Sequence, residues 1–395
     1  MRKKICVVTG SRAEYGLLKP LLEKIKKDKD LQLQLIITGA HLAREFGLTY
    51  REIEKDGFRI DSKINILSGC DTPVGISKSM AKAMSGFAAA YERMRPNIIV
   101  VLGDRFEIFS AVTTAHVARI PVAHIHGGEL TEGAIDDAFR HSITKMSQLH
   151  FTATEEYRKR VIQLGESPGR VFNVGALGLD GLDSMPLLSR QQLEKEMGLR
   201  FDRNNLLVTF HPATLESGSS RGQFSNLLAV LDGLSSTHII FTKSNADMGG
   251  KIINSMINKY VSRKPDKAKA FASMGRINYL STMRFMDAVV GNSSSGLTEA
   301  PSFRIGTINI GDRQSGRIKA KSVIDCDHSR DGIAKAIRRL YSAEFQDSLR
   351  RVVNPYEKRG TAFRILKVLK RFGFENGIKK SFYDISFRVK DRCRK

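Results

Sequence analysis

The chain has 395 residues, of which 41% are hydrophobic, and its formal net charge is +23. A chain of this length is too long for a single domain with one ordinary core and fits two domains with an appendage. No run of apolar residues approaches the ~20 that a membrane helix needs. The charge suits nucleic acid or an anionic substrate, and no nucleic-acid-binding motif is present. We therefore predict an enzyme for an anionic substrate, without nucleic-acid binding or membrane insertion.

The first ten residues combine Arg and Lys with a short apolar run, as a secretion signal does. The run ends before Thr9 and no small-residue cleavage site follows it, so we interpret it as a first strand. The four cysteines share no metal-type spacing, which favours a reduced, cytoplasmic protein; they are Cys6, Cys70, Cys326 and Cys393.

In the first half of the chain, short runs rich in Val and Ile alternate with helix-length segments. Strand–helix–strand repetition predicts a parallel sheet that is covered on both faces. The predicted strands are Ile5–Thr9, Leu31–Thr38, Ile98–Leu102, Val122–Ile125, Leu149–Thr152 and Val171–Val174, and the predicted helices include Leu17–Lys27 and Met80–Arg95.

A polar stretch over Ser184–Asn205 precedes a second set of strands, and this restart of the pattern divides the chain. The second set is Leu206–Phe210, His238–Thr242, Ala288–Gly291 and Gly306–Ile310. We predict an α/β fold with Rossmann-like domains over 1–182 and 183–353. A helical segment over 354–376 can dock on either domain, and a basic tail follows over 377–395. Because ligands of such sheets bind beyond the carboxyl ends of the strands, residues there are the candidates.

The first predicted strand leads into Thr9-Gly10-Ser11-Arg12, a Gly-containing turn before a helix. Such a turn favours anions, and Arg12 can bind a phosphate or pair with a structural acid. The turn lacks the GxGxxG pattern of dinucleotide sites. The strand Ile98–Leu102 leads into Gly103-Asp104-Arg105, where Asp104 is either a general base or a helix N-cap and Arg105 can bind phosphate.

The strand Val122–Ile125 continues into His126-Gly127-Gly128-Glu129. Strand alternation predicts His124 and His126 on one face, and we favour acid–base chemistry or sugar binding over a metal because no further ligand follows nearby. Asp136 and Asp137 open the next helix, where one can cap it while the other reaches the cleft.

In the second half, His211 follows a strand and can contact a diphosphate, and Lys243–Gly250 is a polar turn able to line a nucleotide. The segment Gly291–Glu299 combines free backbone N–H groups and hydroxyls at a helix start, which predicts a phosphate cradle. Glu299 can then accept a ribose; the alternative is a capped turn with Glu299 as a surface charge. Arg313 adds a cation, and neither a P-loop nor a nucleophile elbow is present.

Taken in order, these motifs strongly resemble the UDP-N-acetylglucosamine 2-epimerase family, over about residues 4–370. The chain looks most like the hydrolysing branch that makes N-acetylmannosamine for sialic acid synthesis, because the non-hydrolysing branch has Glu where this chain has His126. The resemblance implies a glycosyltransferase-B-like fold with an interdomain cleft, a final helix that returns to the N-terminal domain, and a homodimer or homotetramer.

The resemblance also implies site residues and neither a metal nor another cofactor. The UDP-binding set is Arg12, Arg105, His211, Asn245, Met274, Ser293, Ser294, Glu299 and Arg313. The catalytic set is Asp104, His126, Glu129, Asp137 and His211, and the sugar-binding set is Asp136 and Arg140.

The implied reaction removes the C2 proton as UDP leaves C1, and water then adds to the unsaturated sugar with protonation at C2 from the opposite face. UDP-N-acetylglucosamine is the expected substrate, and a UDP-2,4-diacetamido-trideoxyhexose for legionaminic-type acids is the alternative. A glycosyltransferase and a non-catalytic nucleotide-binding protein are the alternatives from other classes.

Overall fold

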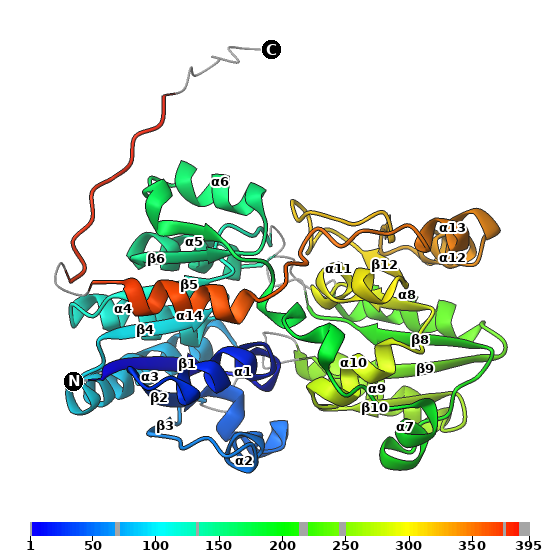
Figure 1. Cartoon of the computed structure of the whole chain (residues 1–395). Helices are drawn as coiled ribbons and strands as arrows, with labels where there is room; N and C mark the ends of the chain where they lie inside the picture. The colour runs from blue at the N-terminus through cyan, green and yellow to red at the C-terminus, as the bar shows by residue number, and fades with distance from the viewer. Residues whose placement is uncertain are drawn as a thin grey trace.

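The computed structural model describes residues 2–67, 72–131, 134–212, 220–244, 250–373 and 377–386. The chain forms two parallel sheets that lie side by side, each flanked by helices (Figure 1). The predicted fold class, two Rossmann-like α/β domains, is therefore confirmed.

The first sheet has seven strands in the order β3-β2-β1-β4-β5-β6-β7, all paired in parallel. The order reverses between β1 and β4, which is where open α/β sheets bind ligands. The strands are β1 Lys3–Thr9, β2 Leu31–Thr38, β3 Ser62–Ile64, β4 Ile98–Leu102, β5 Val122–Ile125, β6 Leu149–Thr152 and β7 Val171–Asn173. The helices are α1 Arg12–Lys27, α2 Tyr50–Lys55, α3 Pro73–Met94, α4 Phe106–Val117, α5 Asp136–Met146 and α6 Glu155–Gln163.

The second sheet has six strands in the order β10-β9-β8-β11-β12-β13, also all parallel, and it reverses between β8 and β11. The strands are β8 Asn204–Thr209, β9 Thr237–Thr242, β10 Ala268–Phe271, β11 Ala288–Gly291, β12 Gly306–Ile310 and β13 Val323–Cys326. The helices are α7 Arg190–Met197, α8 Ser220–Asp232, α9 Gly250–Arg263, α10 Arg276–Met283, α11 Ser295–Thr298, α12 Arg330–Leu340 and α13 Ala343–Leu349. Short 3₁₀ helices join elements in both halves: η1 Gly39–Leu42, η2 Arg44–Phe46, η3 Pro168–Arg170, η4 Leu177–Leu179, η5 Leu182–Ser184 and η6 Ala300–Phe303.

Each sheet is buried on both faces, as its continuous apolar strands require. In β1, Ile5 and Val7 join the core on one side, whereas Cys6 and Val8 join the core on the other. The second sheet divides in the same way, with Leu206 on one side and Leu207 on the other. Two layers of packed side chains therefore hold each sheet, so the loops at its carboxyl edge extend from a rigid base.

The ten strands predicted from sequence are all present, with ends that differ by at most a few residues. Three further strands, β3, β10 and β13, were missed. Each lies at the edge of its sheet and has only three or four residues. Such short segments give too little periodicity to identify from sequence.

The last helix, α14 (Thr361–Arg371), crosses back from the second sheet and packs on the first (Figure 1). Its Ala362, Ile365 and Leu369 are buried in the same core as β1 and α1. Its first backbone N–H groups, those of Thr361 and Ala362, donate to the Asp180 carboxylate at 3.0 and 2.9 Å. A carboxylate from the interdomain segment thus caps this helix and fixes where it begins.

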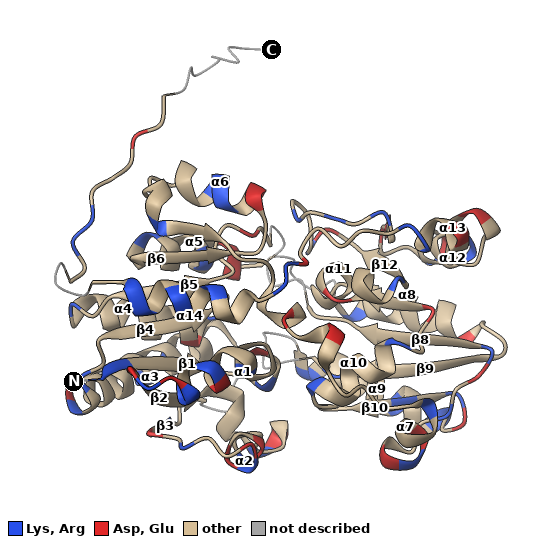
Figure 2. Ribbon diagram, in the orientation of Figure 1, with Lys and Arg blue, Asp and Glu red and all other residues tan. Residues whose placement is uncertain are grey.

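Residues 377–386 form no helix or strand, and hydrogen bonds and ion pairs connect them to the first domain. The Lys380 ammonium lies 2.7 Å from the buried carboxylate of Glu166, and the Tyr383 N–H donates to the carbonyl of Gly165 at 2.9 Å. Lys and Arg residues recur along α14 and this segment (Figure 2). Part of the predicted basic tail is therefore attached to the first domain. Within the described residues, no helix combines the length and apolar character needed to cross a bilayer.

Candidate active site in the interdomain cleft

A cavity of about 370 Å³ lies between the two domains, at the carboxyl ends of strands from both sheets. This volume lies within the usual range for small-molecule sites. Residues after β1 and β4 line it from the first domain, and residues after β8, β9, β11 and β12 line it from the second. Strand-end residues from both halves therefore share one site.

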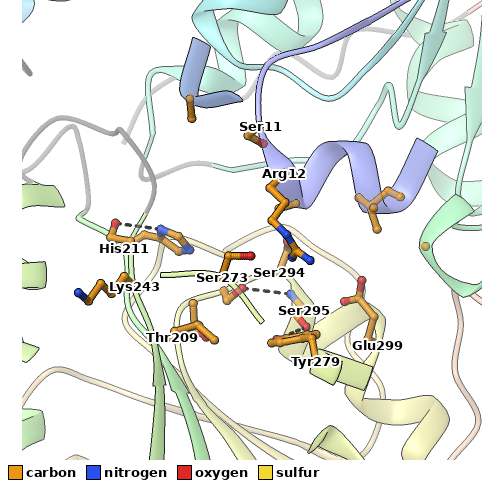
Figure 3. A pocket seen from close by; sticks show the side chains of 18 of the residues that line it. Ser11, Arg12, Thr209, His211, Lys243, Ser273, Tyr279, Ser294, Ser295 and Glu299 are labelled. Atoms are coloured by element: carbon orange, nitrogen blue, oxygen red, sulfur yellow. Dashed lines mark hydrogen bonds between the residues drawn. The ribbon is translucent and has the colours of Figure 1, made fainter. Parts of the chain in front are cut away.

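Arg12 enters this cavity from the start of α1, a helix that begins five residues earlier than predicted. Ser11 is its N-cap and accepts a hydrogen bond from the Glu14 N–H. The Arg12 Nε atom lies 2.9 and 2.7 Å from the two carboxylate oxygens of Glu52, and the guanidinium lies against Gly275 of the other domain. Arg12 thus pairs with a structural acid, one of the two alternatives, and still faces the cleft (Figure 3).

Asp104 also lines the cavity, and its carboxylate pairs with Arg140 of α5. Gly103 precedes it with a φ of +81°, which turns the chain out of β4. Helix α4 begins after Arg105 without a side-chain cap, so the N-cap alternative for Asp104 does not apply. The Arg105 Nε atom lies 2.7 Å from the buried Glu107 carboxylate, which holds this second arginine at the cavity wall.

The two histidines at the end of β5, His124 and His126, lie differently from the prediction. His124 is buried, with its ring nitrogens 2.8 Å from the carbonyl of Gly103 and 3.1 Å from the hydroxyl of Thr144, and burial lowers its pKa to about 3. His126 lies beyond the end of β5 with a φ of +67°. The strand alternation therefore stops before it, and the prediction that both side chains share a face is wrong. His124 instead supports the turn that presents Asp104.

His126 accepts a hydrogen bond from the Leu177 N–H at its Nε2 atom, over 3.3 Å. Its Nδ1 atom, which then carries the proton, lies 3.4 Å from a carboxylate oxygen of Glu129. Burial lowers the pKa of His126, and the nearby arginine charges act in the same direction. Neither His126 nor Glu129 lines the cavity. Both lie behind Arg140, whose guanidinium contacts the Glu129 carboxylate and the His126 carbonyl.

The two acids at the start of α5 separate as predicted, since only one of them lines the cavity. That residue is Asp136, which sequence reasoning assigned to sugar binding. Asp137 points back into the loop, where its carboxylate accepts from the Thr131 N–H at 2.6 Å and lies 3.5 Å from His141. Because the first helical turn rotates by about 100° per residue, adjacent side chains diverge in this way.

The second domain builds its wall around Asn292. The Asn292 side chain accepts from the His211 N–H at 2.7 Å and donates to the His211 carbonyl at 2.8 Å. Its backbone carbonyl accepts from Arg313 at 3.0 Å and Gln314 at 2.8 Å. One amide therefore fastens the loops after β8, β11 and β12 together, and His211, Arg313 and Gln314 all line the cavity.

Ser293, Ser294 and Ser295 follow at the start of the short helix α11 and line the cavity. Figure 3 shows Ser294 and Ser295 in this wall. The Tyr279 hydroxyl lies 2.7 Å from that of Ser295. Glu299 lines the same wall beside Thr298, and burial raises its pKa above the ordinary value. Glu299 is therefore a cavity residue and not an exposed surface charge.

Met274 lines the cavity on the loop after β10, together with Ser273 and Gly275. Asn245, the remaining predicted UDP contact, lies outside the described residues. In the described part of the chain, no group of three or more His, Cys, Asp or Glu side chains is arranged to hold a metal ion.

Comparisons with known proteins identify the family of this chain. A family model described as UDP-N-acetylglucosamine 2-epimerase matches residues 23–370. The chain belongs to this family. Over 385 residues it is 43% identical to the GDP/UDP-N,N'-diacetylbacillosamine 2-epimerase (hydrolyzing) of Campylobacter jejuni, covering 97% of this chain and 100% of that one. It is 40% identical to polysialic acid biosynthesis protein P7 of Escherichia coli, over 97% and 98% of the two chains.

Among solved structures, the UDP-GlcNAc 2-epimerase of Neisseria meningitidis bound to UDP-GlcNAc is similar with a TM-score of 0.78 at 17% identity. The match covers 93% of this chain and all of the other. This likeness confirms the predicted glycosyltransferase-B-like arrangement of two domains. The resemblance stated from the motifs is confirmed by the family match.

Sequence reasoning missed several residues that line the cleft, above all Arg276, Tyr279, Gln314 and Arg317. Arg276 and Tyr279 lie on a helix after an edge strand that was itself missed, so no strand end pointed to them. Gln314 and Arg317 follow the predicted Arg313 in one short loop, and that proximity was the available signal.

Arg276 ties the two domains together at the edge of this cavity. Helix α1 contains Pro20, which has no N–H to donate to the carbonyl of Gly16 four residues earlier. Arg276 of the second domain supplies that donor at 3.1 Å, and its other terminal nitrogen donates to the carbonyls of Gly178 and Asp180 at 2.8 and 3.2 Å. A proline in one domain thus creates an acceptor for an arginine in the other.

We expect Arg276→Ala to lower the free energy of unfolding by about 2 kcal/mol, because three carbonyls lose a charged donor. Denaturant unfolding followed by circular dichroism measures this change. The matched control is Arg284→Ala at the exposed end of the same helix, which we expect to change stability by less than about 0.5 kcal/mol. Equal unfolding curves for the two variants would show that the Arg276 contacts contribute nothing.

Proposed function

We propose that the protein is a hydrolysing 2-epimerase, which binds a UDP-2-acetamido sugar in the cleft, inverts the configuration at C2 and releases UDP. One observation carries the proposal: Asp104 and Asp136 line the same cavity as the hydroxyl-rich start of α11 and six arginines. The two relatives described above support it, since one is named as a hydrolyzing 2-epimerase and the other as a polysialic acid biosynthesis protein.

For UDP, the second domain supplies most of the binding groups in this proposal. Ser293 and Ser294, with the backbone N–H groups around them, bind the diphosphate, and Arg12, Arg105, His211 and Arg313 add positive charge or donors. Glu299 accepts the ribose hydroxyls, while the Met274 backbone contacts the base. These groups stabilise the negative charge that develops on UDP as it leaves.

The chemistry needs a group that takes a proton from C2 and one that returns a proton to C2 from the opposite face. Asp104 and Asp136 are the carboxylates that line the described cavity from the first domain. In the first step the C2–H bond and the C1–O bond to UDP break, which forms the C1–C2 double bond. In the second step water adds its OH to C1, and C2 gains a proton on the other face. Because elimination removes the C2 proton, no redox cofactor is required.

His126, Glu129 and Asp137 then act indirectly. His126 and Glu129 contact Arg140, which holds Asp104, and Asp137 holds the Thr131 backbone beside the cavity. In this proposal the proton-transfer groups of the first domain are therefore Asp104 and Asp136, and the other three fix their surroundings.

The sugar is proposed to be that of UDP-N-acetylglucosamine, which yields N-acetylmannosamine for sialic acid synthesis. The second candidate is UDP-N,N'-diacetylbacillosamine, because the Campylobacter relative at 43% identity bears that name. From the resemblance to the family we also expect a homodimer or homotetramer.

Incubation with each sugar nucleotide in deuterated water, followed by NMR of the products, tests the proposal. We expect free UDP and N-acetylmannosamine that carries deuterium at C2. A product that is still linked to UDP would refute hydrolysis. Turnover of the diacetamido sugar alone would replace the first candidate by the second. UDP binding without turnover of either would indicate a non-catalytic protein.

A further inference from the structure

Arg317 of the second domain reaches across the cleft and is bound by the first domain. Its side chain is only 7% exposed. The Nε atom donates to the carbonyl of Leu130 at 2.8 Å, one terminal nitrogen lies 3.2 Å from the Thr131 hydroxyl, and the other lies 3.0 Å from the Glu129 carboxylate. All three acceptors belong to the segment that follows His126.

Arg140 binds two of these three residues, Glu129 and Thr131, through their side chains. The Arg140 guanidinium lies 3.2 Å from the same oxygen of Glu129 and 3.1 Å from the Thr131 hydroxyl, and it pairs with Asp104. Two arginines and two carboxylates therefore form one buried network, in which their formal charges cancel. Burial alone would raise the pKa of Glu129, but the charges of Arg317, His126 and Arg140 outweigh it and lower the pKa.

This charge balance depends on contact between the domains. Glu129, Arg140 and Asp104 all belong to the first domain, and Arg317 is the member that the second domain contributes. Without Arg317, the buried Glu129 carboxylate would keep Arg140 as its arginine partner and His126 as a weaker one, and a poorly compensated buried charge is costly. Arg140 would then be drawn toward Glu129 and away from Asp104.

Two tyrosines hold the loop that carries Arg317. The Tyr157 hydroxyl accepts from the Ile318 N–H at 3.0 Å, and the Tyr356 hydroxyl donates to the Ile318 carbonyl at 2.7 Å. The two hydroxyls lie 2.8 Å apart, so Tyr157 donates its proton to Tyr356. Both residues are buried, Tyr157 on α6 and Tyr356 on the segment that leads to α14. Both backbone polar groups of Ile318, the residue after Arg317, are therefore hydrogen-bonded, which fixes the loop at this point.

We propose that Arg317 is a positioning residue of the epimerase reaction: by crossing onto Glu129, it holds the Arg140–Asp104 pair in its reactive arrangement when the cleft is closed. The proposal rests on the function proposed above. It makes domain closure part of the assembly of the catalytic groups, because the network is complete only when both domains contribute. It also gives Glu129 and the Tyr157–Tyr356 pair a role in turnover without contact with the sugar.

The test compares Arg317→Gln and Arg317→Lys with the wild type, using the sugar nucleotide that the wild type turns over. We expect Arg317→Gln to lower kcat 10- to 100-fold while the Kd for UDP changes less than about threefold, since Arg317 acts on Asp104 and is not among the proposed UDP contacts. Arg317→Lys keeps the positive charge but lacks the planar guanidinium that contacts three acceptors at once. We expect its kcat to lie between those of Arg317→Gln and the wild type. Lys319→Ala, in the same loop but paired with Asp325, is the matched control and should keep both values.

A double variant with Glu129→Gln identifies the route. If Arg317 acts through Glu129, the double variant should have nearly the kcat of the single Glu129→Gln variant. A loss of UDP affinity that matches the loss of kcat would overturn the proposal in favour of a ligand contact, and so would an unchanged kcat in Arg317→Gln. Failure of the wild type to turn over either sugar nucleotide would instead count against the proposed function. In that case small-angle scattering with and without UDP still tests closure: Arg317→Gln should remain more open than the wild type, and equal compaction would refute the role.

Discussion

Asp104→Asn is expected to lower kcat by about 10²- to 10⁴-fold, the usual contribution of a general base or acid. Asparagine keeps the shape of the side chain but cannot take a proton from carbon at neutral pH. Asp104 lies just after β4, beside Gly103, and its carboxylate pairs with Arg140, which fixes its position at the cavity wall. Steady-state release of UDP measures the effect.

The same variant should bind UDP with nearly unchanged affinity, because the proposed diphosphate contacts come from other residues. This combination separates a catalyst from a protein that merely binds nucleotides. Asp137→Asn is the matched control, since Asp137 is a nearby aspartate whose side chain does not line the cavity. A similar loss of kcat in both variants would contradict the assignment of proton transfer to Asp104 and Asp136.

The positions of the strands, and therefore of the cleft, could be predicted because β1, β4, β5, β8 and β11 are short apolar runs with clear ends. Parallel strands bring their carboxyl ends to one edge of a sheet, so Arg12 and Asp104 were expected to lie near each other in the first domain, and His211 and Ser293 in the second. In this respect local pattern and global fold agree.

Side-chain direction could not be predicted in the same way. From the sequence, Asp136 and Asp137 are equally good candidates for a residue of the cleft. Only the rotation of α5 against the sheet decides that Asp136 lines the cavity. His126 has a left-handed backbone conformation that turns it toward Leu177, and nothing in the strand pattern signals this change. Arg276 and Arg317 act on the other domain, and contacts between residues so far apart in sequence leave no local signature.

Gly291→Ala is expected to destabilise the second domain by about 3 kcal/mol or more, through backbone strain together with a collision. Gly291 ends β11 with a φ of +132°, a conformation that side chains rarely adopt. A Cβ atom there would lie 1.9 Å from the carbonyl oxygen of Thr209 on the neighbouring strand β8. That oxygen belongs to the centre of the sheet, so it cannot move aside without disrupting the ladder between β8 and β11.

The same change should weaken UDP binding at least tenfold in the protein that remains folded, because Asn292 follows directly and fastens the loops of His211 and Arg313. Denaturant unfolding and UDP titration measure the two effects. Gly222→Ala is the matched control: a Cβ at this position in α8 meets nothing within 4 Å, and alanine should stabilise the helix by up to about 1 kcal/mol. If Gly291→Ala has the stability and UDP affinity of the wild type, the end of β11 can shift, and UDP binding does not depend on the close approach of Gly291 to Thr209.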